Sequence, residues 1–291
     1  MELLYDICKP LIGVVHLPPL PGSPGYKRNP YPRLHGRRWD VGDIVEYAVE
    51  EARKYYEAGF DGIILENFGD RPFTMTVSPG QAISLALIAS EVNKSVPIRV
   101  GVNALRNSAY EALYIAYIAR LSMIRVNNMC EVRVSPEGIM EPAAQRLAQA
   151  AAELDAFDHL NSGKIVVFAD VDVKHSARVG SEYDLRETVS DCIERAGASI
   201  GYIVATGSRT GSEPDLELVE VMASAAKPLG SRIAIGSGVS QDNIATYWKV
   251  ADAFIVGSSV KVGGQAENPV STEKARNLVK LVHRYRKIFP C

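Results

Sequence analysis

Short apolar runs rich in β-branched residues alternate along the chain with longer segments in which apolar residues recur at helical spacing. This alternation predicts strands and helices in turn, which is the pattern of a parallel α/β sheet. Eight runs can be counted, and eight parallel strands favour closure into a barrel. The predicted strands are residues 11–17, 62–67, 97–103, 123–127, 164–175, 201–206, 232–238 and 253–259.

The segments between these runs carry helix signals. In one of them Ser78 is placed to cap a helix, Pro79 to occupy its first turn and Gln81 to complete a capping box. In another, apolar residues lie three and four positions apart between residues 110 and 118. No change of composition marks a linker, so we predict one domain over residues 1–291, a single (β/α)8 TIM barrel with its helices outside.

Residues 18–40 do not fit this alternation. The stretch has no periodicity, is rich in Pro, Gly and Arg, and is longer than an ordinary βα loop. We expect a long loop after the first strand that closes over the barrel mouth as a basic lid, with a solvated surface loop as the alternative. Its basic residues are Lys27, Arg28, Arg33, Arg37 and Arg38.

Composition narrows the classes of function. With 47% hydrophobic and 23% charged residues the chain has the balance of a globular protein, and its net charge of −2 gives no reason to expect nucleic acid as a partner. The four cysteines form no C-x-x-C pair, so we expect neither a zinc ribbon nor a disulfide framework. This use of cysteine favours a cytoplasmic location.

The sequence contains neither a secretory signal nor an apolar run long enough to span a membrane. Peripheral contact with a membrane stays open. On general grounds we expect a homo-oligomer.

Polar residues recur at the carboxyl ends of the predicted strands, where barrels of this kind build their active sites. Any one of them could be a satisfied core residue, but their recurrence at one end favours a site. These residues are His16, Glu66, Asn67, Asn103, Asn127, Asp170, Asp172, Lys174, His175, Thr206, Ser237 and Ser258. Of these we expect Asn67, Asn103, Asn127 and Thr206 to bind the substrate.

Two glycine motifs follow the last two predicted strands, GSGVS at 236–240 and GSS at 257–259. Glycine lets backbone N–H groups approach an anion closely, and a following helix with Ser240 as its cap would add a favourable dipole. A tight turn explains either motif alone, whereas the two together in this order predict a phosphate site. The expected ligand-binding residues here are Ser237, Gly238, Val239, Gly257, Ser258, Ser259 and Lys261.

The fifth predicted strand contains FADVDVKH, in which Asp170, Asp172 and Lys174 share one face and the two valines share the other. If the valines face the helices, the charges point into the barrel, and Lys174 needs a carboxylate partner there. In such a network the lysine could stabilise an oxyanion, or a carboxylate could act as a general base. The alternative is an ion pair with a structural role only. The candidate catalytic residues are Lys174, Asp172, Asp170, Glu66, His16 and His175.

Cofactor signals are weak. His16, Glu66, Asp170 and Asp172 could converge on a divalent metal, but residues on separate strands give no distance information. No organic cofactor is indicated. GSRTG at 207–211 is a glycine-bounded loop that could close over a ligand or be only a turn.

Seven motifs occur in order along almost the whole chain: GVVHLPPLPGSPGY at 13–26, ENFGDRPF at 66–73, GVNALRN at 101–107, ADVDVKHS at 169–176, TGSRTG at 206–211, GSGVS at 236–240 and IVGSSVK at 255–261. In these motifs the chain resembles the BtpA/SgcQ family. The resemblance implies a TIM barrel of the ribulose-phosphate-binding type. It also implies kinship with one branch linked to photosystem I biogenesis at a membrane surface and another found beside sugar-uptake genes, but it implies no settled reaction.

Two functions stay open. The first is an enzyme acting on a small phosphorylated sugar or nucleotide-derived metabolite, as an isomerase, a lyase or a glycosyl-bond-cleaving enzyme. The second is a noncatalytic assembly or stabilisation factor for a membrane complex, with the barrel as a scaffold. The charges of the fifth strand favour the enzyme, because a scaffold gains little from charges inside a barrel.

Overall fold

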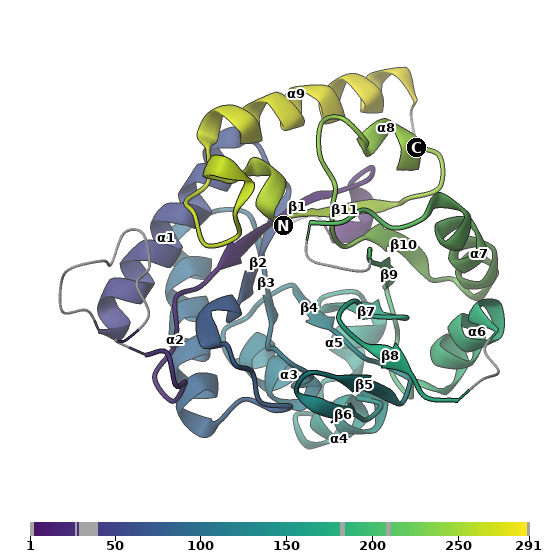
Figure 1. Ribbon diagram of the computed structural model, residues 1–291, viewed down its shortest axis with the longest axis horizontal. Helices are drawn as coiled ribbons and strands as arrows, with labels where there is room; N and C mark the ends of the chain where they lie inside the picture. Colours follow the sequence, from purple (N-terminus) through teal and green to yellow (C-terminus); the bar gives the residue numbers. More distant parts are fainter. Residues whose placement is uncertain (1–2, 27, 29–39, 181–183, 208–210, 290–291) are drawn as a thin grey trace.

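A closed barrel of parallel strands forms the centre of the molecule (Figure 1). The computed structural model describes residues 3–26, 28, 40–180, 184–207 and 211–289. The barrel order is β1-β11-β10-β9-β7-β4-β3-β2, so strands adjacent in the chain are neighbours around the barrel, and the predicted fold is confirmed. The strands are β1 (Leu11–His16), β2 (Gly62–Glu66), β3 (Arg99–Asn103), β4 (Met123–Val126), β7 (Val166–Asp170), β9 (Tyr202–Ala205), β10 (Arg232–Ile235) and β11 (Ala253–Val256).

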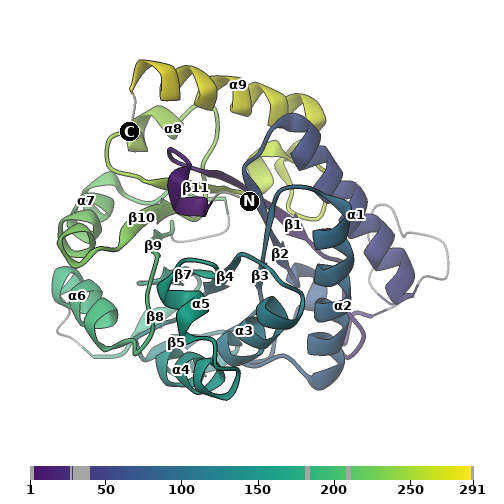
Figure 2. The same ribbon diagram turned by 180° about the vertical axis from the view of Figure 1, so that it is seen from behind.

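Helices surround the barrel on its outside (Figures 1 and 2). The predicted capping box opens α2: the Ser78 hydroxyl accepts from the backbone N–H of Gln81 at 3.3 Å, and the Gln81 side chain accepts from the backbone N–H of Ser78 at 2.8 Å. The helices are α1 (Val41–Ala58), α2 (Pro79–Ser95), α3 (Ala109–Ile118), α4 (Ala144–Glu153), α5 (Phe157–Asn161), α6 (Leu185–Arg195), α7 (Leu216–Ala226), α8 (Ile244–Tyr247) and α9 (Thr272–Ile288).

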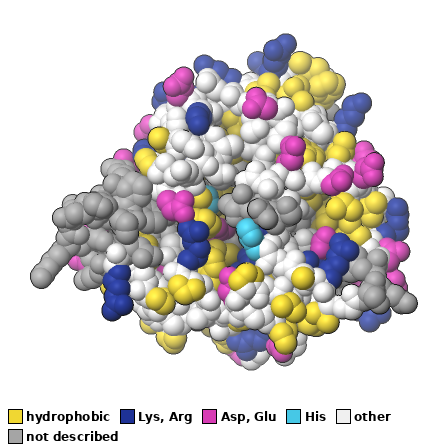
Figure 3. Space-filling view, viewed as in Figure 1, with side chains coloured by type: hydrophobic (Ala, Val, Ile, Leu, Met, Phe, Trp, Pro, Cys, Tyr) yellow, Lys and Arg dark blue, Asp and Glu magenta, His cyan; other side chains and the backbone are white. Residues whose placement is uncertain are grey.

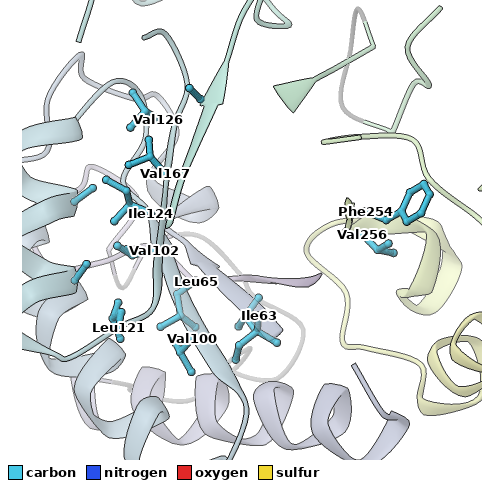
Figure 4. Packing of buried hydrophobic residues seen from close by; sticks show 14 of the residues in the cluster. Ile63, Leu65, Val100, Val102, Leu121, Ile124, Val126, Val167, Phe254 and Val256 are labelled. Carbon is cyan, nitrogen blue, oxygen red and sulfur yellow. The ribbon is translucent and has the colours of Figure 1, made fainter. Parts of the chain in front are cut away.

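Two hydrophobic cores follow from the period of two along the strands, because successive side chains point to opposite faces. The larger core fills the space between strands and helices, where Figure 4 shows Ile63, Leu65, Val100 and Val102. The smaller core lies inside the barrel and includes Phe168 of β7, whose ring stacks on that of Tyr202 with centroids 4.5 Å apart.

The amino-terminal end of the barrel is closed by the short 3-10 helix η1 (Leu4–Asp6). Tyr5 stacks on Tyr202, the first residue of β9, with ring centroids 5.9 Å apart, and the Arg232 guanidinium lies 4.6 Å from the Tyr5 ring centre. Arg232 also donates a hydrogen bond to the Tyr5 carbonyl at 3.0 Å. Figure 2 shows this segment near the centre of the barrel's rear face. Figure 1 faces the opposite, carboxyl end of the barrel strands.

A small antiparallel sheet of order β6-β5-β8 was not expected from the sequence. It joins the connection after β4, which supplies β5 (Arg133–Ser135) and β6 (Gly138–Met140), to the connection after β7, which supplies β8 (Ala177–Arg178). The predicted strand 164–175 was therefore too long. β7 ends at Asp170, and the backbone leaves the extended conformation at Asp172 and His175, whose φ angles of 54° and 58° are left-handed.

The expectation that the cysteines form no disulfide was wrong. Cys130, in the connection after β4, is bonded to Cys192 of α6 across a sequence separation of 62 residues, and Cys8 is also disulfide-bonded. Spacing along the chain carried no signal, because the barrel brings together segments that are far apart in sequence.

Part of the loop predicted at 18–40 lies beside the second βα connection. The backbone N–H of Leu20 donates to the Asp70 carboxylate at 2.7 Å, and the N–H of Gly69 donates to the Leu17 carbonyl at 3.0 Å. Residues 27 and 29–39, with most of the basic side chains, fall outside the described residues, as do residues 208–210 of GSRTG. The lid therefore stays a prediction. Within the described part of the chain, no helix is long and apolar enough to cross a membrane.

Candidate functional site

A cavity of about 1410 Å³ opens at the carboxyl end of the barrel strands. Figure 3 shows this face, with histidine side chains near its centre. The predicted site residues on the cavity wall are His16, Glu66, Asn127, Lys174, His175, Ser237, Gly238, Gly257, Ser258 and Ser259. The predicted site residues that do not line it are Asn67, Asn103, Asp170, Asp172, Thr206, Val239 and Lys261.

A row of polar residues crosses four neighbouring strands at this end. His16 of β1 lies opposite Glu66 of β2 in the strand register. Glu66 in turn lies opposite Asn103 of β3, and Asn103 lies opposite Arg125 of β4. The amide of Asn103 donates to Glu66 Oε2 at 2.7 Å, and His16 Nε2 lies 3.9 Å from Glu66 Oε1. Asn103, which does not line the cavity, therefore supports Glu66, which does.

His16 is held uncharged. Burial lowers the pKa of His16 well below its ordinary value, and the positive charges of Lys261, Lys174 and Arg71 lower it further, against a hydrogen bond with the backbone of Ala266. The ring of Phe68 packs edge-on against the imidazole, with centroids 4.8 Å apart. A neutral imidazole beside a carboxylate can accept or deliver a proton, which is the arrangement required for acid–base catalysis.

Arg125 is a site residue that the sequence reasoning missed. Its Nε and Nη2 atoms each donate to one Asp170 oxygen at 2.9 Å, and Nη1 donates to the Gly236 carbonyl at 3.4 Å. Burial alone would lower the pKa of Arg125, but the charge and hydrogen bonds of Asp170 raise it above its ordinary value. Asp170 is fully buried behind this guanidinium, so its role in the structure is to fix Arg125 on the cavity wall.

Lys174 lies on the cavity wall as predicted, but its predicted carboxylate partner was wrong. Asp170 pairs with Arg125, and Asp172 pairs with Arg133 at 2.9 Å and with Arg178 at 2.7 Å. The left-handed turn at Asp172 directs its carboxylate to the small sheet and away from the cavity.

The backbone of Lys174 is fixed on both sides. Its N–H donates to Thr206 Oγ1 at 3.2 Å, and its carbonyl accepts from Arg106 Nη2 at 2.8 Å. Burial lowers the pKa of Lys174 to about 8, and the charges of Arg125 and Arg106 act in the same direction against those of Glu66 and Asp170. Thr206, predicted to bind a ligand, instead positions the Lys174 segment.

The two glycine motifs form adjoining parts of the wall. Gly238 has a φ of 72°, and a Cβ atom there would lie 2.3 Å from the backbone nitrogen of Glu213, so the turn requires glycine. In the described part of the chain, the backbone N–H groups of Gly238, Gly257 and Ser258 donate no hydrogen bond. These donors are therefore available to a ligand at the cavity wall.

The serine side chains of these motifs hold the loops together. Ser237 accepts from the N–H of Gly207 at 3.0 Å and donates to the Ser212 carbonyl at 3.0 Å, while Ser259 donates to the Val239 carbonyl at 2.6 Å. The expected cap and helix dipole were wrong. The Ser240 hydroxyl accepts from the N–H of Asp242 in a turn, and α8 begins only at Ile244 and has four residues.

Three residues that were predicted to bind a ligand do not line the cavity and instead contact other parts of the protein. Lys261 is fully buried, with its Nζ 3.8 Å from Glu51 Oε2, because the chain turns behind the wall after Ser259. Val239 is buried in the outer core. Asn67 accepts from the N–H of Leu105 at 2.7 Å and donates to Asp70 at 2.9 Å, which links the second and third βα connections.

Arg71 and Arg106 also reach the cavity wall and were missed. Arg106 is buried, with Nε 3.6 Å from Glu137 Oε2, and Arg71 pairs with Glu267 and lies over the Phe68 ring at 4.3 Å. Both stand in motifs that carried the family resemblance, ENFGDRPF and GVNALRN, which was the only signal for them.

The predicted metal ligands do not come together. Among the described residues, no group of three His, Cys, Asp or Glu side chains is placed to hold a metal ion. Asp170 and Asp172 are each bound to arginine, and only His16 and Glu66 of the four candidates are close to each other at the cavity.

Sequence comparison places the chain among known proteins. The profile of the BtpA family matches residues 7–284. An uncharacterised protein of Pyrococcus abyssi is 42% identical over 96% of this chain and 97% of its own length. The photosystem I biogenesis protein BtpA of Synechocystis is 37% identical over 91% of this chain and 85% of its own length.

Among solved structures, a chain of the tryptophan synthase complex of Pyrococcus furiosus superposes with a TM-score of 0.55 over 94% of this chain and 100% of that one, at 14% identity. This likeness concerns the fold. The match of the family profile over nearly the whole chain, together with the Synechocystis relative, shows that the chain belongs to the BtpA family.

Proposed function

We propose that this protein is an enzyme that binds a small phosphorylated sugar or nucleotide-derived metabolite at the carboxyl face of its barrel. One observation carries the proposal: Gly238, Gly257 and Ser258, whose backbone N–H groups donate no hydrogen bond within the described part of the chain, line one cavity together with Arg125. Backbone N–H groups beside a cation form a favourable site for a phosphate group. In barrels of this type the loops after the last two strands commonly supply that site.

The remaining wall supports chemistry and not binding alone. Burying the Arg125–Asp170 pair requires desolvation of two charges, which a purely structural barrel avoids by using apolar residues. His16 and Glu66 provide a neutral base beside a carboxylate, and Lys174 adds an amine whose pKa is lowered to about 8. An isomerase, a lyase or a glycosyl-bond-cleaving enzyme would each use such groups.

A noncatalytic assembly factor is the second candidate. It is supported by the printed name of the Synechocystis relative, a photosystem I biogenesis protein, and by an apolar row on the small sheet. Ile139 and Ala177 are the register partners of Val134 on either side, and Ile139 is 65% and Val134 46% exposed. Exposed apolar rows of this kind mark contact surfaces.

A thermal-shift screen separates the two candidates. Phosphorylated sugars and nucleotides are compared with the same compounds lacking phosphate, since a ligand at 100 times its Kd adds about 2.7 kcal/mol of stability. The enzyme proposal expects some phosphorylated compounds to raise the melting temperature while their unphosphorylated counterparts do not. If no phosphorylated compound exceeds its counterpart, the proposal is wrong and the assembly factor is favoured.

A further inference from the structure

Among the described lysine and arginine side chains that line the cavity, Lys174 is the one without an ion-pair partner, since Arg71, Arg106 and Arg125 are all paired. The two nearest candidates along the chain are engaged elsewhere, Asp170 with Arg125 and Asp172 with Arg133 and Arg178. Lys174 is nevertheless half-buried and lines the cavity. Lys174 therefore lines the ligand space without a carboxylate paired to its amine among the described residues.

The groups around Lys174 disfavour its charged form. Arg106 is fixed close by, because it donates to the carbonyl of Lys174 itself, and Arg125 is fixed by both Asp170 oxygens. Burial and these two cations outweigh the attraction of Glu66 and Asp170, and the pKa of Lys174 falls to about 8. About a tenth of the amine is then uncharged at pH 7, compared with less than a thousandth for an exposed lysine. A lysine whose pKa is lowered by burial and by neighbouring cations supplies more of the neutral amine that attacks a carbonyl.

We propose that Lys174 forms an imine with the carbonyl group of an open-chain phosphorylated sugar held in the cavity. The inference rests on the proposed function, since the N–H groups of Gly238, Gly257 and Ser258 would hold the phosphate end of that sugar. It narrows the substrate to phosphorylated aldoses and ketoses, and it gives Lys174 a covalent role.

The described residues supply the groups that this chemistry needs. As the lone pair of Nζ forms a bond to the carbonyl carbon, the carbon–oxygen double bond becomes a single bond. The nitrogen gives up one proton and the oxygen takes up one, which gives a carbinolamine. Loss of that oxygen as water then leaves a carbon–nitrogen double bond, so no oxidant or reductant is consumed. His16 and Glu66 line the same cavity and can deliver and accept the protons of these steps.

Lys261 provides an internal contrast. Burial lowers its pKa to about 8 as well, but its Nζ is fully buried, lies 3.8 Å from Glu51 and does not reach the cavity. Lys261 is therefore expected to be unreactive, and the reactivity of Lys174 depends on its place on the wall.

The test is reductive trapping. The whole protein is incubated with dihydroxyacetone phosphate or ribose 5-phosphate, or with dihydroxyacetone or ribose, and then reduced with sodium borohydride. Intact mass and peptide mapping locate the adduct. We expect one adduct, at Lys174, at least tenfold more abundant with the phosphorylated probes. It should be absent from Lys174→Arg, whose guanidinium cannot form an imine, and retained in Lys164→Arg, which replaces an exposed lysine.

The outcomes are distinct. Adducts spread over exposed lysines, or equal labelling of Lys174→Arg with an unchanged melting temperature, would overturn the inference. No adduct from probes that do raise the melting temperature would also overturn it, while leaving the proposed phosphate-binding function in place. An adduct at Lys174 from dihydroxyacetone, without any preference for phosphorylated compounds in trapping or thermal shift, would support imine formation and contradict the proposed function.

Discussion

Replacing Arg125 by Met would remove the guanidinium and leave Asp170 without its partner. Asp170 is fully buried, and both of its oxygens accept a hydrogen bond of 2.9 Å from Arg125. Removing one partner of a buried, hydrogen-bonded ion pair costs about 3 to 5 kcal/mol, because a charge remains in a medium that solvates it poorly. That is a large part of the roughly 5 to 15 kcal/mol by which proteins are stable.

The assay is urea unfolding of the wild type and of two variants at pH 7. Lys94→Met is the matched control, since Lys94 pairs with Glu91 at 2.8 Å but its side chain is 68% exposed, and such surface pairs contribute about 0 to 1 kcal/mol. Arg125→Met/Asp170→Asn should recover part of the loss, because the amide carries no charge. A loss below about 1 kcal/mol for Arg125→Met, equal to that of the control, would refute the reasoning from burial.

Three further predictions follow from the same structure. Lys174→Met should not lower the unfolding free energy at pH 7 in urea titrations, because no carboxylate among the described residues is paired with Lys174. As the pKa of Lys174 is lowered to about 8 in the folded state, wild-type stability relative to this variant should rise between about pH 8 and pH 10. Gly238→Ala should weaken phosphate-ligand binding in calorimetry by at least tenfold, since its Cβ would lie 2.3 Å from Glu213 N; unchanged affinity would contradict the wall geometry. Replacing Cys130 and Cys192 by Ser should lower the unfolding free energy by about 2 to 4 kcal/mol in urea under non-reducing conditions.

The eight barrel strands could be predicted because each is a short apolar run bounded by helical segments. The one large error in strand length, at 164–175, has a physical cause. Burial still alternates after Asp170, with Val171 and Val173 buried and Asp172 and Lys174 half-buried, although the strand has ended. Periodicity in sequence reports which side chains are buried, and it does not report the left-handed turn at Asp172 that ends the strand.

The sequence could predict which end of the barrel holds the site, but it could not predict which charged side chains pair with each other there. His16 and Glu66, the last residues of β1 and β2, reach the cavity, as their position at the carboxyl ends of the strands predicts. Asn103 and Asp170, the last residues of β3 and β7, do not line it and instead hold Glu66 and Arg125. Residues beyond the strand, such as Asp172 and Lys261, follow loop conformations that no local pattern specifies. Arg125 lay inside an apolar run, where a lone arginine was the signal for an inward-facing charge. A cytoplasmic location and a homo-oligomeric state stay predictions.

The central claim is that backbone N–H groups after β10 and β11 hold a phosphate. An NMR titration of ¹⁵N-labelled protein with ribose 5-phosphate, using ribose as the control, observes these groups directly. If these groups bind phosphate, the amide resonances of Gly238, Gly257 and Ser258 shift together and saturate with the phosphorylated sugar only. Binding that leaves these three resonances unchanged while shifting others would contradict it.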